Sequence, residues 1–275
     1  MSAILKPGWS KPSTILYASE IPVNQKAFAF ALAQAREFGS HLIPDKERQI
    51  APLAAKGAIF IDGEIGGTPT MVSARKAVVY LAGDAEAAKT LEPVVRGFTD
   101  IVHYFGPFGS ASKVKLVNNL LVAVHIAATA EAMALGLKAG VDVDLMIKAV
   151  AAGSGGSAQF GVRAPWMAQR RFLPAHGNVP GLSHYFDLIG ALADRAGVAT
   201  PMLDRAIELY ERCTAMGLGE LDHAVMVDVV ASMPRGKRTK TKAASPKKRK
   251  LKAGKVKKNA ARKSAKKTKS RRRTR

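Results

Sequence analysis

A lysine and two asparagines follow a glycine-containing loop near the middle of the chain. Residues 106–119 read GPFGSASKVKLVNN, which sets Lys115, Asn118 and Asn119 at spacings of three and four. In a helix those spacings place the three side chains on one face. Two adjacent asparagines cost a helix roughly 1 kcal/mol relative to alanine. In a helix otherwise rich in Leu, Val and Ala, this pair predicts a polar site or a buried hydrogen-bond network.

The same face would give Lys115 the chemistry of a general acid or base. The helix dipole disfavours a cation near the start of a helix by about a few tenths of a kcal/mol. A lysine that is also partly buried there has a lowered pKa, as proton transfer near neutral pH requires. The alternative interpretation makes Lys115 a surface lysine and the asparagines caps of a neighbouring loop. Spacing alone favours that alternative, because isolated motifs mislead often.

The elements that must position this face begin with an α/β pattern. Strands are expected at 58–65, 77–82 and 101–105, and helices at 25–38, 45–56 and 84–98. Gly57 is the expected C-terminal cap of the second helix, and Asp84 the expected N-cap of the third. Alternating strands and helices indicate an α/β layer with a largely parallel sheet.

From Gly106 onward the pattern is helical, without a strand signal. Thr200 and Pro201 form a recognisable helix start, with a hydroxyl N-cap followed by proline at the first helical position. The expected helices are 113–139, 143–152, 188–196, 201–216 and 220–232. The fold class is therefore α/β then all-α, with an α/β domain at 1–105, an all-helical domain at 106–232 and a tail at 233–275.

The tail carries the whole excess of positive charge. Of the 43 Lys and Arg residues, 22 lie from Met233 onward, where no acid occurs, so the preceding body has a formal charge of zero. A segment with so few apolar residues is predicted to be disordered and to bind nucleic acid or another polyanion by counterion release. The alternative is a solubility tail. The candidate contacts are Lys247, Lys248, Arg249, Lys250, Arg271, Arg272 and Arg273.

Several classes of protein are disfavoured. Cys213 is the only cysteine, so we expect no intrachain disulfide and no Cys-based metal site. We predict no other metal site. The longest apolar stretch, 116–130, contains polar residues and is shorter than the roughly 20 residues that span a membrane. The N-terminus lacks a signal-peptide core. We expect a soluble, cytoplasmic protein, with the nucleoid or the nucleus as alternatives because of the tail.

Two motifs resemble one enzyme family. The pattern GxxGxxxxxKxxNN at 106–119 resembles the signature of the β-hydroxyacid dehydrogenases, which include 3-hydroxyisobutyrate dehydrogenase and 6-phosphogluconate dehydrogenase. Upstream, IDGEIGGTP at 61–69 resembles the D-A-P-V-S-G-G substrate loop of that family. The run AATAEAMALGLKAG at 127–140 is similar to the family's continuation of the lysine-bearing helix. The resemblance covers about residues 45–232.

The resemblance implies a fold, a reaction and a site. The fold would be a partial Rossmann-like sheet followed by a helical dehydrogenase domain. The reaction would oxidise a small β-hydroxyacid by hydride transfer to NAD or NADP. Lys115 and Asn119 would be catalytic, Gly66, Gly67, Thr68 and Asn118 would bind substrate, and Asp187 would lie near the cofactor. Separately, the long apolar helix predicts a homodimer through the helical domain.

The chain departs from the family at three places. It has no G-x-G-x-x-G turn, because only Gly8, Gly39 and Gly57 precede residue 58. The loop serine falls at Gly66 and the second loop glycine at Thr68. The lysine of a later Lys-Asp pair falls at Phe186, where nearby His184 could substitute. Two functions stay open: an NAD(P)-dependent oxidoreductase, or a catalytically silent dehydrogenase-like protein that binds nucleic acid through its tail.

Overall fold

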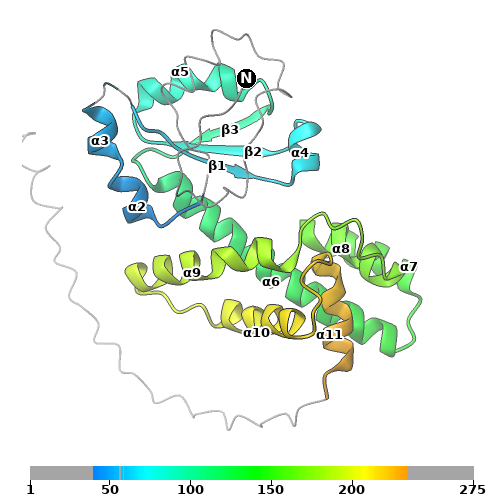
Figure 1. The fold of residues 1–275 in the computed structure, drawn as a ribbon. Coiled ribbons are helices and arrows are strands. Elements are labelled where there is room, and N and C mark those ends of the chain that lie inside the picture. Colours follow the sequence, from blue (N-terminus) through cyan, green and yellow to red (C-terminus); the bar gives the residue numbers. More distant parts are fainter. Residues whose placement is uncertain (1–39, 56, 58, 235–275) are drawn as a thin grey trace, which may run out of the picture. The chain divides into compact units, whose positions relative to one another are not determined.

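The computed structural model describes residues 40–55, 57 and 59–234 (Figure 1). The described residues up to Met233 belong to one compact unit, and Pro234 begins another. The helix expected at 25–38 and the polyanion contacts expected in the tail lie outside the described residues. The boundary expected between residues 105 and 106 stays a prediction.

The helix expected at 45–56 is two short helices. α2 spans Ile43–Glu47 and α3 spans Ile50–Ala54. Pro52 explains the break, because proline has no N–H to donate and its ring clashes with the carbonyl four residues earlier. The C-cap of α3 is Ala55, two residues before the predicted cap; Gly57 follows at a φ of 71°, with its N atom 2.9 Å from the Ala54 oxygen.

Three strands form a sheet in the order β1-β2-β3. The strands are β1 (Asp62–Gly66), β2 (Val78–Ala82) and β3 (Ile101–Tyr104). β2 and β3 are parallel, but β1 and β2 are antiparallel, where the pattern predicted a largely parallel sheet. The link through α4 (Pro69–Ser73) is near the lower length limit of a parallel crossover, about a dozen residues, which favours the antiparallel pairing.

The two faces of the sheet differ in chemistry. Side chains alternate along a strand, so Ile61, Val79 and Leu81 point to one face, where they pack against α5 (Ala85–Val95). The other face carries Asp62, Glu64 and Tyr80. This face lies against the start of α6, whose ribbon runs from the sheet into the helical part in Figure 1. Asp84 caps α5 by accepting from Ala87 N–H at 2.8 Å, as predicted. The polar face is the one that carries the site.

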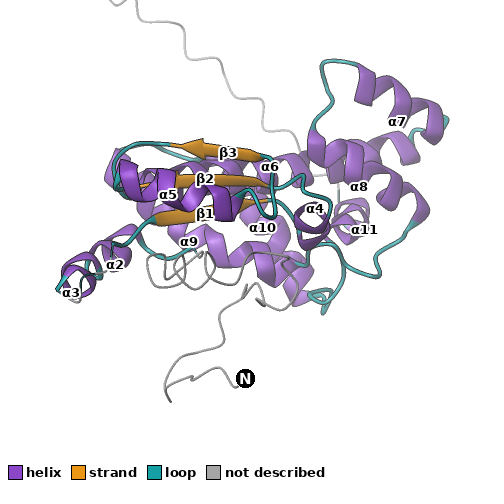
Figure 2. Cartoon of the chain, turned by 90° about the horizontal axis from the view of Figure 1, so that it is seen from above, coloured by secondary structure: helices purple, strands orange, loops and turns teal. Residues whose placement is uncertain are grey.

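α6 connects the sheet to the helical part. It spans Ser110–Lys138 and is the central helix on which the other helices pack (Figures 1 and 2). Around it lie α7 (Val143–Ala152), α8 (Ala158–Gln169), α9 (Val179–Ala196), α10 (Pro201–Ala215), a 3₁₀ turn (His223–Val225) and α11 (Met226–Ser232). The α/β-then-helical class is confirmed.

Several helix bounds differ from the prediction. α8 was missed, because Gly161 and Pro165 interrupt its pattern; Ser157 caps it by accepting from Phe160 N–H at 3.0 Å. α9 begins at Val179, earlier than expected, and the helix expected at 220–232 starts with the 3₁₀ turn. Thr200 occupies the N-cap position of α10, but the predicted hydroxyl cap is wrong, since its side chain makes no capping hydrogen bond.

Of the helices that the structure describes, α6 alone has the length and apolar composition of a membrane span. Its apolar composition has a cause within the fold. Side chains from several turns of α6, including Leu116, Ala123, Ile126 and Met133, enter the main hydrophobic core with α8, α9, α10 and α11. A helix surrounded by others is apolar on several sides, whereas a surface helix carries one apolar stripe.

Candidate active site

Lys115 lies buried where α6 crosses the end of β1. Its residue surface is 8% exposed, and its Nζ donates to the carbonyl oxygen of Ile65 at 2.6 Å. Tyr185 of α9 presents its ring to the same ammonium, with Nζ 5.5 Å from the ring centroid. The interpretation of Lys115 as a surface lysine is therefore wrong. β1, α6 and α9 together enclose this side chain.

Two influences set the proton affinity of Lys115. Burial removes water from the ammonium and lowers the pKa of Lys115 below its ordinary value. The Glu64 carboxylate opposes this effect by favouring the charged form. The balance leaves a lysine that releases its proton more readily than a solvated one, which a general acid or base requires.

The loop after β1 places glycines where side chains do not fit. A Cβ atom on Gly66 would lie 2.6 Å from the Tyr80 hydroxyl oxygen, and one on Gly67 would lie 3.1 Å from Ala77 Cβ. Thr68 uses its hydroxyl to cap α4, accepting from Met71 N–H at 3.3 Å. Among the described residues, the N–H groups of Gly67 and Thr68 donate to no backbone carbonyl. These two donors are available to an anionic ligand.

The two asparagines bond to each other. Asn118 Nδ2 donates to Asn119 Oδ1 at 3.2 Å, and Asn119 is 5% exposed. Both follow Lys115 on the same face of α6, as predicted. Within the described part of the chain, neither amide hydrogen-bonds to Lys115. The substrate and catalytic roles of Asn118 and Asn119 stay predictions.

A buried polar cluster lies one helical turn before Lys115. Lys46 Nζ donates to Asp62 Oδ1 at 2.7 Å, to Ser112 Oγ at 2.9 Å and to Glu64 Oε1 at 3.1 Å. All four residues are 2% exposed or less. Ser40 adds a hydrogen bond to Glu64 Oε2 at 2.7 Å. The cluster fixes α2, β1 and α6 to one another and so holds Lys115 in place.

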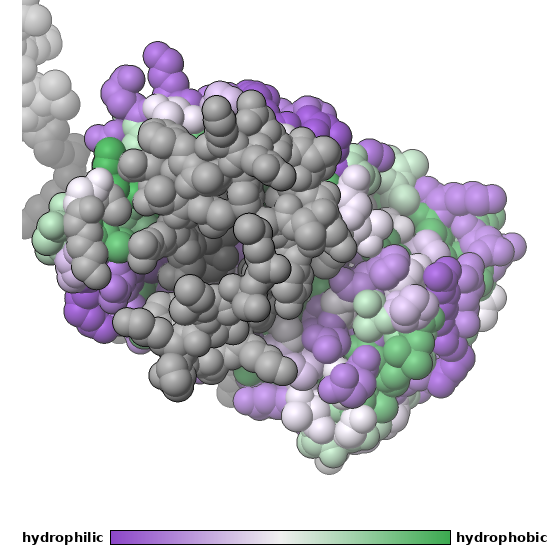
Figure 3. All heavy atoms as spheres, turned by 45° about the horizontal axis from the view of Figure 1, so that its top comes forward, coloured by the Kyte–Doolittle hydropathy of each residue, from purple (hydrophilic) through white to green (hydrophobic). Residues whose placement is uncertain are grey.

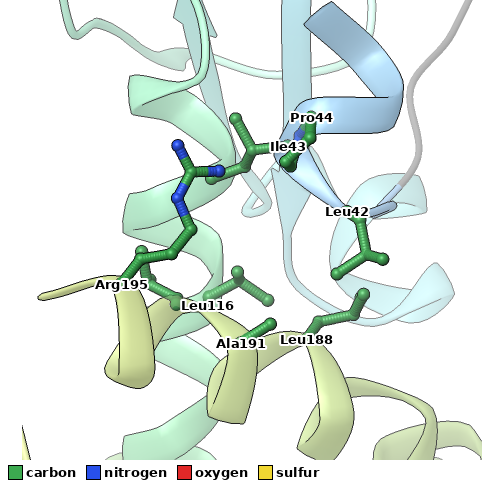
Figure 4. Close-up of a pocket in the computed structure, with 8 residues that line it drawn as sticks. Leu42, Ile43, Pro44, Leu116, Leu188, Ala191 and Arg195 are labelled. Carbon is green, nitrogen blue, oxygen red and sulfur yellow. The ribbon is translucent and has the colours of Figure 1, made fainter.

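Apolar packing fixes the other side of α6. In Figure 4, Leu42, Ile43 and Pro44 at the start of α2 gather with Leu116 of α6 and Leu188 of α9 around a small pocket. Leu116 directly follows Lys115, so this contact restrains the helix turn that carries the lysine.

Asp187 lies away from this site. It is exposed on α9 and lines a groove of about 470 Å³ against α10, together with Phe186 and Glu211. It stands two residues after Tyr185, so it faces another side of α9. Among the described residues, the contact of the His184 ring is with Ser40 and not with Lys115: its Nε2 lies 3.4 Å from the Ser40 carbonyl oxygen. The cofactor role of Asp187 stays a prediction.

Sequence reasoning missed four residues of the site: Lys46, Glu64, Tyr80 and Tyr185. A partial signal existed for Glu64, because Asp62 and Glu64 are two apart on a strand and share its face. Lys46 and Tyr185 left no local signal, since their partners lie on other elements of the fold.

A dinucleotide needs a place for its pyrophosphate, and helix N-termini commonly supply it. In the described α/β layer, both longer helices begin at a carboxylate. Asp84 accepts from the first turn of α5, and Asp62 accepts from Ser112 N–H of α6 at 3.0 Å. A carboxylate there competes with an anion and repels it. Neither of these two helix N-termini therefore offers an open site for a pyrophosphate.

The α/β layer, the helical part and the buried lysine at their junction define a dehydrogenase-like protein. Residues 109–230 match the family model described as "NAD-binding of NADP-dependent 3-hydroxyisobutyrate dehydrogenase". The homologues of this chain are β-hydroxyacid dehydrogenases, so the predicted resemblance is confirmed.

Individual relatives show how far the similarity extends. The chain is 29% identical over 181 residues to an L-threonate dehydrogenase of Cupriavidus necator, covering 64% of this chain and 60% of that protein. It is 28% identical over 194 residues to an NAD-dependent L-serine dehydrogenase of Pseudomonas aeruginosa, covering 68% and 65%. The chain thus spans less than two thirds of the length of these relatives.

A solved structure shares the fold. The 3-hydroxyisobutyrate dehydrogenase of Salmonella typhimurium superposes with a TM-score of 0.64 at 24% identity, covering 70% of this chain and 67% of that one. The agreement confirms a Rossmann-like layer followed by a helical domain.

Proposed function

We propose that this chain is an NAD(P)-dependent oxidoreductase that acts on a small β-hydroxyacid, with Lys115 as its general acid and base. The observation that carries the proposal is the burial of Lys115 against the end of β1, with Nζ 2.6 Å from the Ile65 oxygen. The family match and the glycine loop next to this contact support it.

The chain's own residues account for binding and proton transfer. The N–H groups of Gly67 and Thr68, which donate to no backbone carbonyl among the described residues, can hold the carboxylate of a hydroxyacid beside Lys115. The neutral amine of Lys115 then takes the proton of the substrate hydroxyl, and its lowered pKa makes that form accessible. The amides of Asn118 and Asn119 can orient the same hydroxyl. NAD or NADP, proposed from the family, supplies the hydride acceptor when bound.

The first test separates nucleotide binding from catalysis. NAD⁺ and NADP⁺ are titrated calorimetrically into the full chain, and a panel of small hydroxyacids is screened for cofactor reduction. We expect Lys115→Ala to lower the rate by roughly 100-fold or more, as loss of an acid/base group does. Lys113→Ala is the matched control, because Lys113 is exposed on the same helix. Equal rates in both variants would exclude Lys115 as the acid/base.

We also propose a homodimer through the helical part. Apolar side chains are exposed where α6 ends and α7 begins, and Figure 3 shows apolar patches between hydrophilic ones on the surface. These side chains are Leu135, Leu137, Val141 and Leu145. Burying such a patch in a partner would stabilise a dimer. Light scattering that gives a monomer mass would contradict this proposal.

The composition of the tail favours a second candidate activity, the binding of nucleic acid or another polyanion. The 22 basic residues from Met233 onward occur without one acid. Binding by counterion release should weaken steeply with salt and depend little on sequence. Deleting 235–275 should abolish duplex DNA binding, and unchanged binding would refute this candidate. A cytoplasmic location is part of the main proposal, and a nucleoid or nuclear one belongs to this candidate.

A further inference from the structure

Four charged groups are buried together at the junction of α2, β1 and α6. Lys46 is positive and pairs with two carboxylates, Asp62 at 2.7 Å and Glu64 at 3.1 Å. Among the described residues, Lys46 is the only cation that the structure pairs with these two acids, so the two carboxylates carry one negative charge more than Lys46 offsets. Buried charges are costly unless they are paired. Lys115 is also buried and is influenced by the charge of Glu64, and its own charge brings these four described groups to neutrality.

Glu64 is held so that it cannot turn away from either lysine. Ser40 Oγ donates to Oε2 at 2.7 Å, while Lys46 Nζ and Ser112 Oγ lie 3.1 and 3.2 Å from Oε1. At 2% exposure, solvent does not screen its charge appreciably. Lys115 bonds to the carbonyl oxygen of the next residue, Ile65. Glu64 directly precedes the residue whose carbonyl oxygen holds the ammonium, and its charge acts on that ammonium.

The other titratable groups around Lys115 influence its charge state less than Glu64 does. Asp62 is committed to Lys46 and to Ser112 of α6. From α9, Tyr185 offers only the face of its ring, and from β2, burial raises the pKa of the Tyr80 phenol, so it stays neutral near pH 7. Lys113 on α6 is exposed. Glu64 is the acid that opposes the effect of burial on Lys115.

We propose that Glu64 is the positioning residue of this site, whose fixed carboxylate sets the charge state of Lys115. This inference rests on the proposed role of Lys115 as acid and base. Glu64 favours the charged form of Lys115 and so limits how far burial lowers its pKa. Lys46 weakens the effect of Glu64 on the charge of Lys115, because it shares the Glu64 carboxylate. The two residues adjust Lys115 in opposite directions.

The test measures the titration of Lys115 directly. The full chain is labelled with ¹³C at lysine Cε, and the NMR shift of Lys115, assigned by its loss in Lys115→Arg, is followed with pH. Glu64→Gln should lower the midpoint by roughly one pH unit, because it removes a nearby opposite charge. Lys46→Met should raise the midpoint, because it frees the full charge of Glu64. Glu64→Asp should restore most of the wild-type value.

A matched control is Glu86→Gln, an exposed acid on α5 at the opposite face of the sheet, which should leave the midpoint unchanged. Opposite shifts in Glu64→Gln and Lys46→Met support the proposal, since a merely loosened site would move both the same way. Shifts of one sign, or none, overturn it. If Lys46→Met does not fold, Glu64→Gln decides alone, because a loosened and more solvated site would raise the midpoint, whereas loss of the Glu64 charge lowers it. If Glu64→Gln does not fold, Glu64→Asp is compared with Lys46→Met in its place.

The measurement needs no cofactor or substrate. A chain without turnover would refute the proposed function and leave this result standing. If a hydroxyacid is oxidised, the acidic limb of the rate profile should move to lower pH in Glu64→Gln, because the base then loses its proton earlier.

Discussion

The hydroxyl oxygen of Tyr80 lies 2.6 Å from the point that a Cβ atom on Gly66 would occupy. The two residues stand on neighbouring strands, and Tyr80 is the register partner of Glu64, two residues before Gly66. The tyrosine ring packs with Ala82 of its own strand and Ala111 of α6. Gly66 is thus a glycine because a ring from the next strand fills the space of a side chain. The position matches the serine of the family's substrate loop.

The first prediction concerns this contact. Gly66→Ala should lower the free energy of unfolding by about 1–3 kcal/mol, because the ring must shift to admit the methyl group. The penalty should shrink in a Tyr80→Leu background, where the clashing atoms are gone. Urea unfolding of both single variants and the double variant measures this coupling. Gly161→Ala, with open space around its Cβ position, is the control and should cost nothing. Equal penalties in both backgrounds would contradict the contact.

The second prediction concerns a buried ion pair in the helical part. Arg163 Nη1 lies 2.7 Å from Asp222 Oδ2, and Asp222 also accepts from the N–H groups of His176 and Ala224. Asp222→Ala should cost about 3–5 kcal/mol, because it leaves the arginine buried without a partner.

Asp228→Ala is the control for that pair. Its partner Arg170 is exposed, so the loss should be at most about 1 kcal/mol. Chemical denaturation measures both variants. A similar loss in the two would show that the Asp222 pair behaves as a surface pair.

The third prediction concerns acid stability. Burial lowers the pKa of His223 from 6.5 to about 3, with Arg163 adding to the effect. Below pH 6.5 the unfolded chain binds a proton at His223 that the folded chain does not, so stability falls as pH falls towards 3. The slope approaches about 1.4 kcal/mol per pH unit. Between pH 6.5 and 5, before carboxylates titrate, His223→Gln should flatten this dependence; an unchanged slope would place the titration elsewhere.

The fourth prediction uses the single cysteine. Cys213 is fully buried, and burial raises the pKa of its thiol to about 11. At pH 8 this raised pKa should make the thiolate fraction about 100-fold lower than for a free cysteine. Because only the thiolate reacts, labelling should slow by the same factor. A colourimetric thiol reagent should therefore label native protein slowly and denatured protein at once. Rapid native labelling would show that α10 opens locally.

Local patterns in the sequence determined a good part of this protein. The Asp84 cap depends on a backbone group three residues away, so it could be predicted. The shared face of Lys115, Asn118 and Asn119 follows from helical periodicity alone. The two family motifs, in order along the chain, were enough to predict the dehydrogenase-like fold.

Other features depended on how distant segments pack. Whether Lys115 was buried could not be read from α6, since its cover comes from β1 and α9. The antiparallel pairing of β1 depended on the length of one connection. Lys46 hydrogen-bonds to Ser112, which lies 66 positions later in the sequence. No local pattern around either residue predicts this contact. Helix periodicity and capping act over a few residues, whereas charge pairing at this site depends on the packing of three elements, which only the tertiary structure decides.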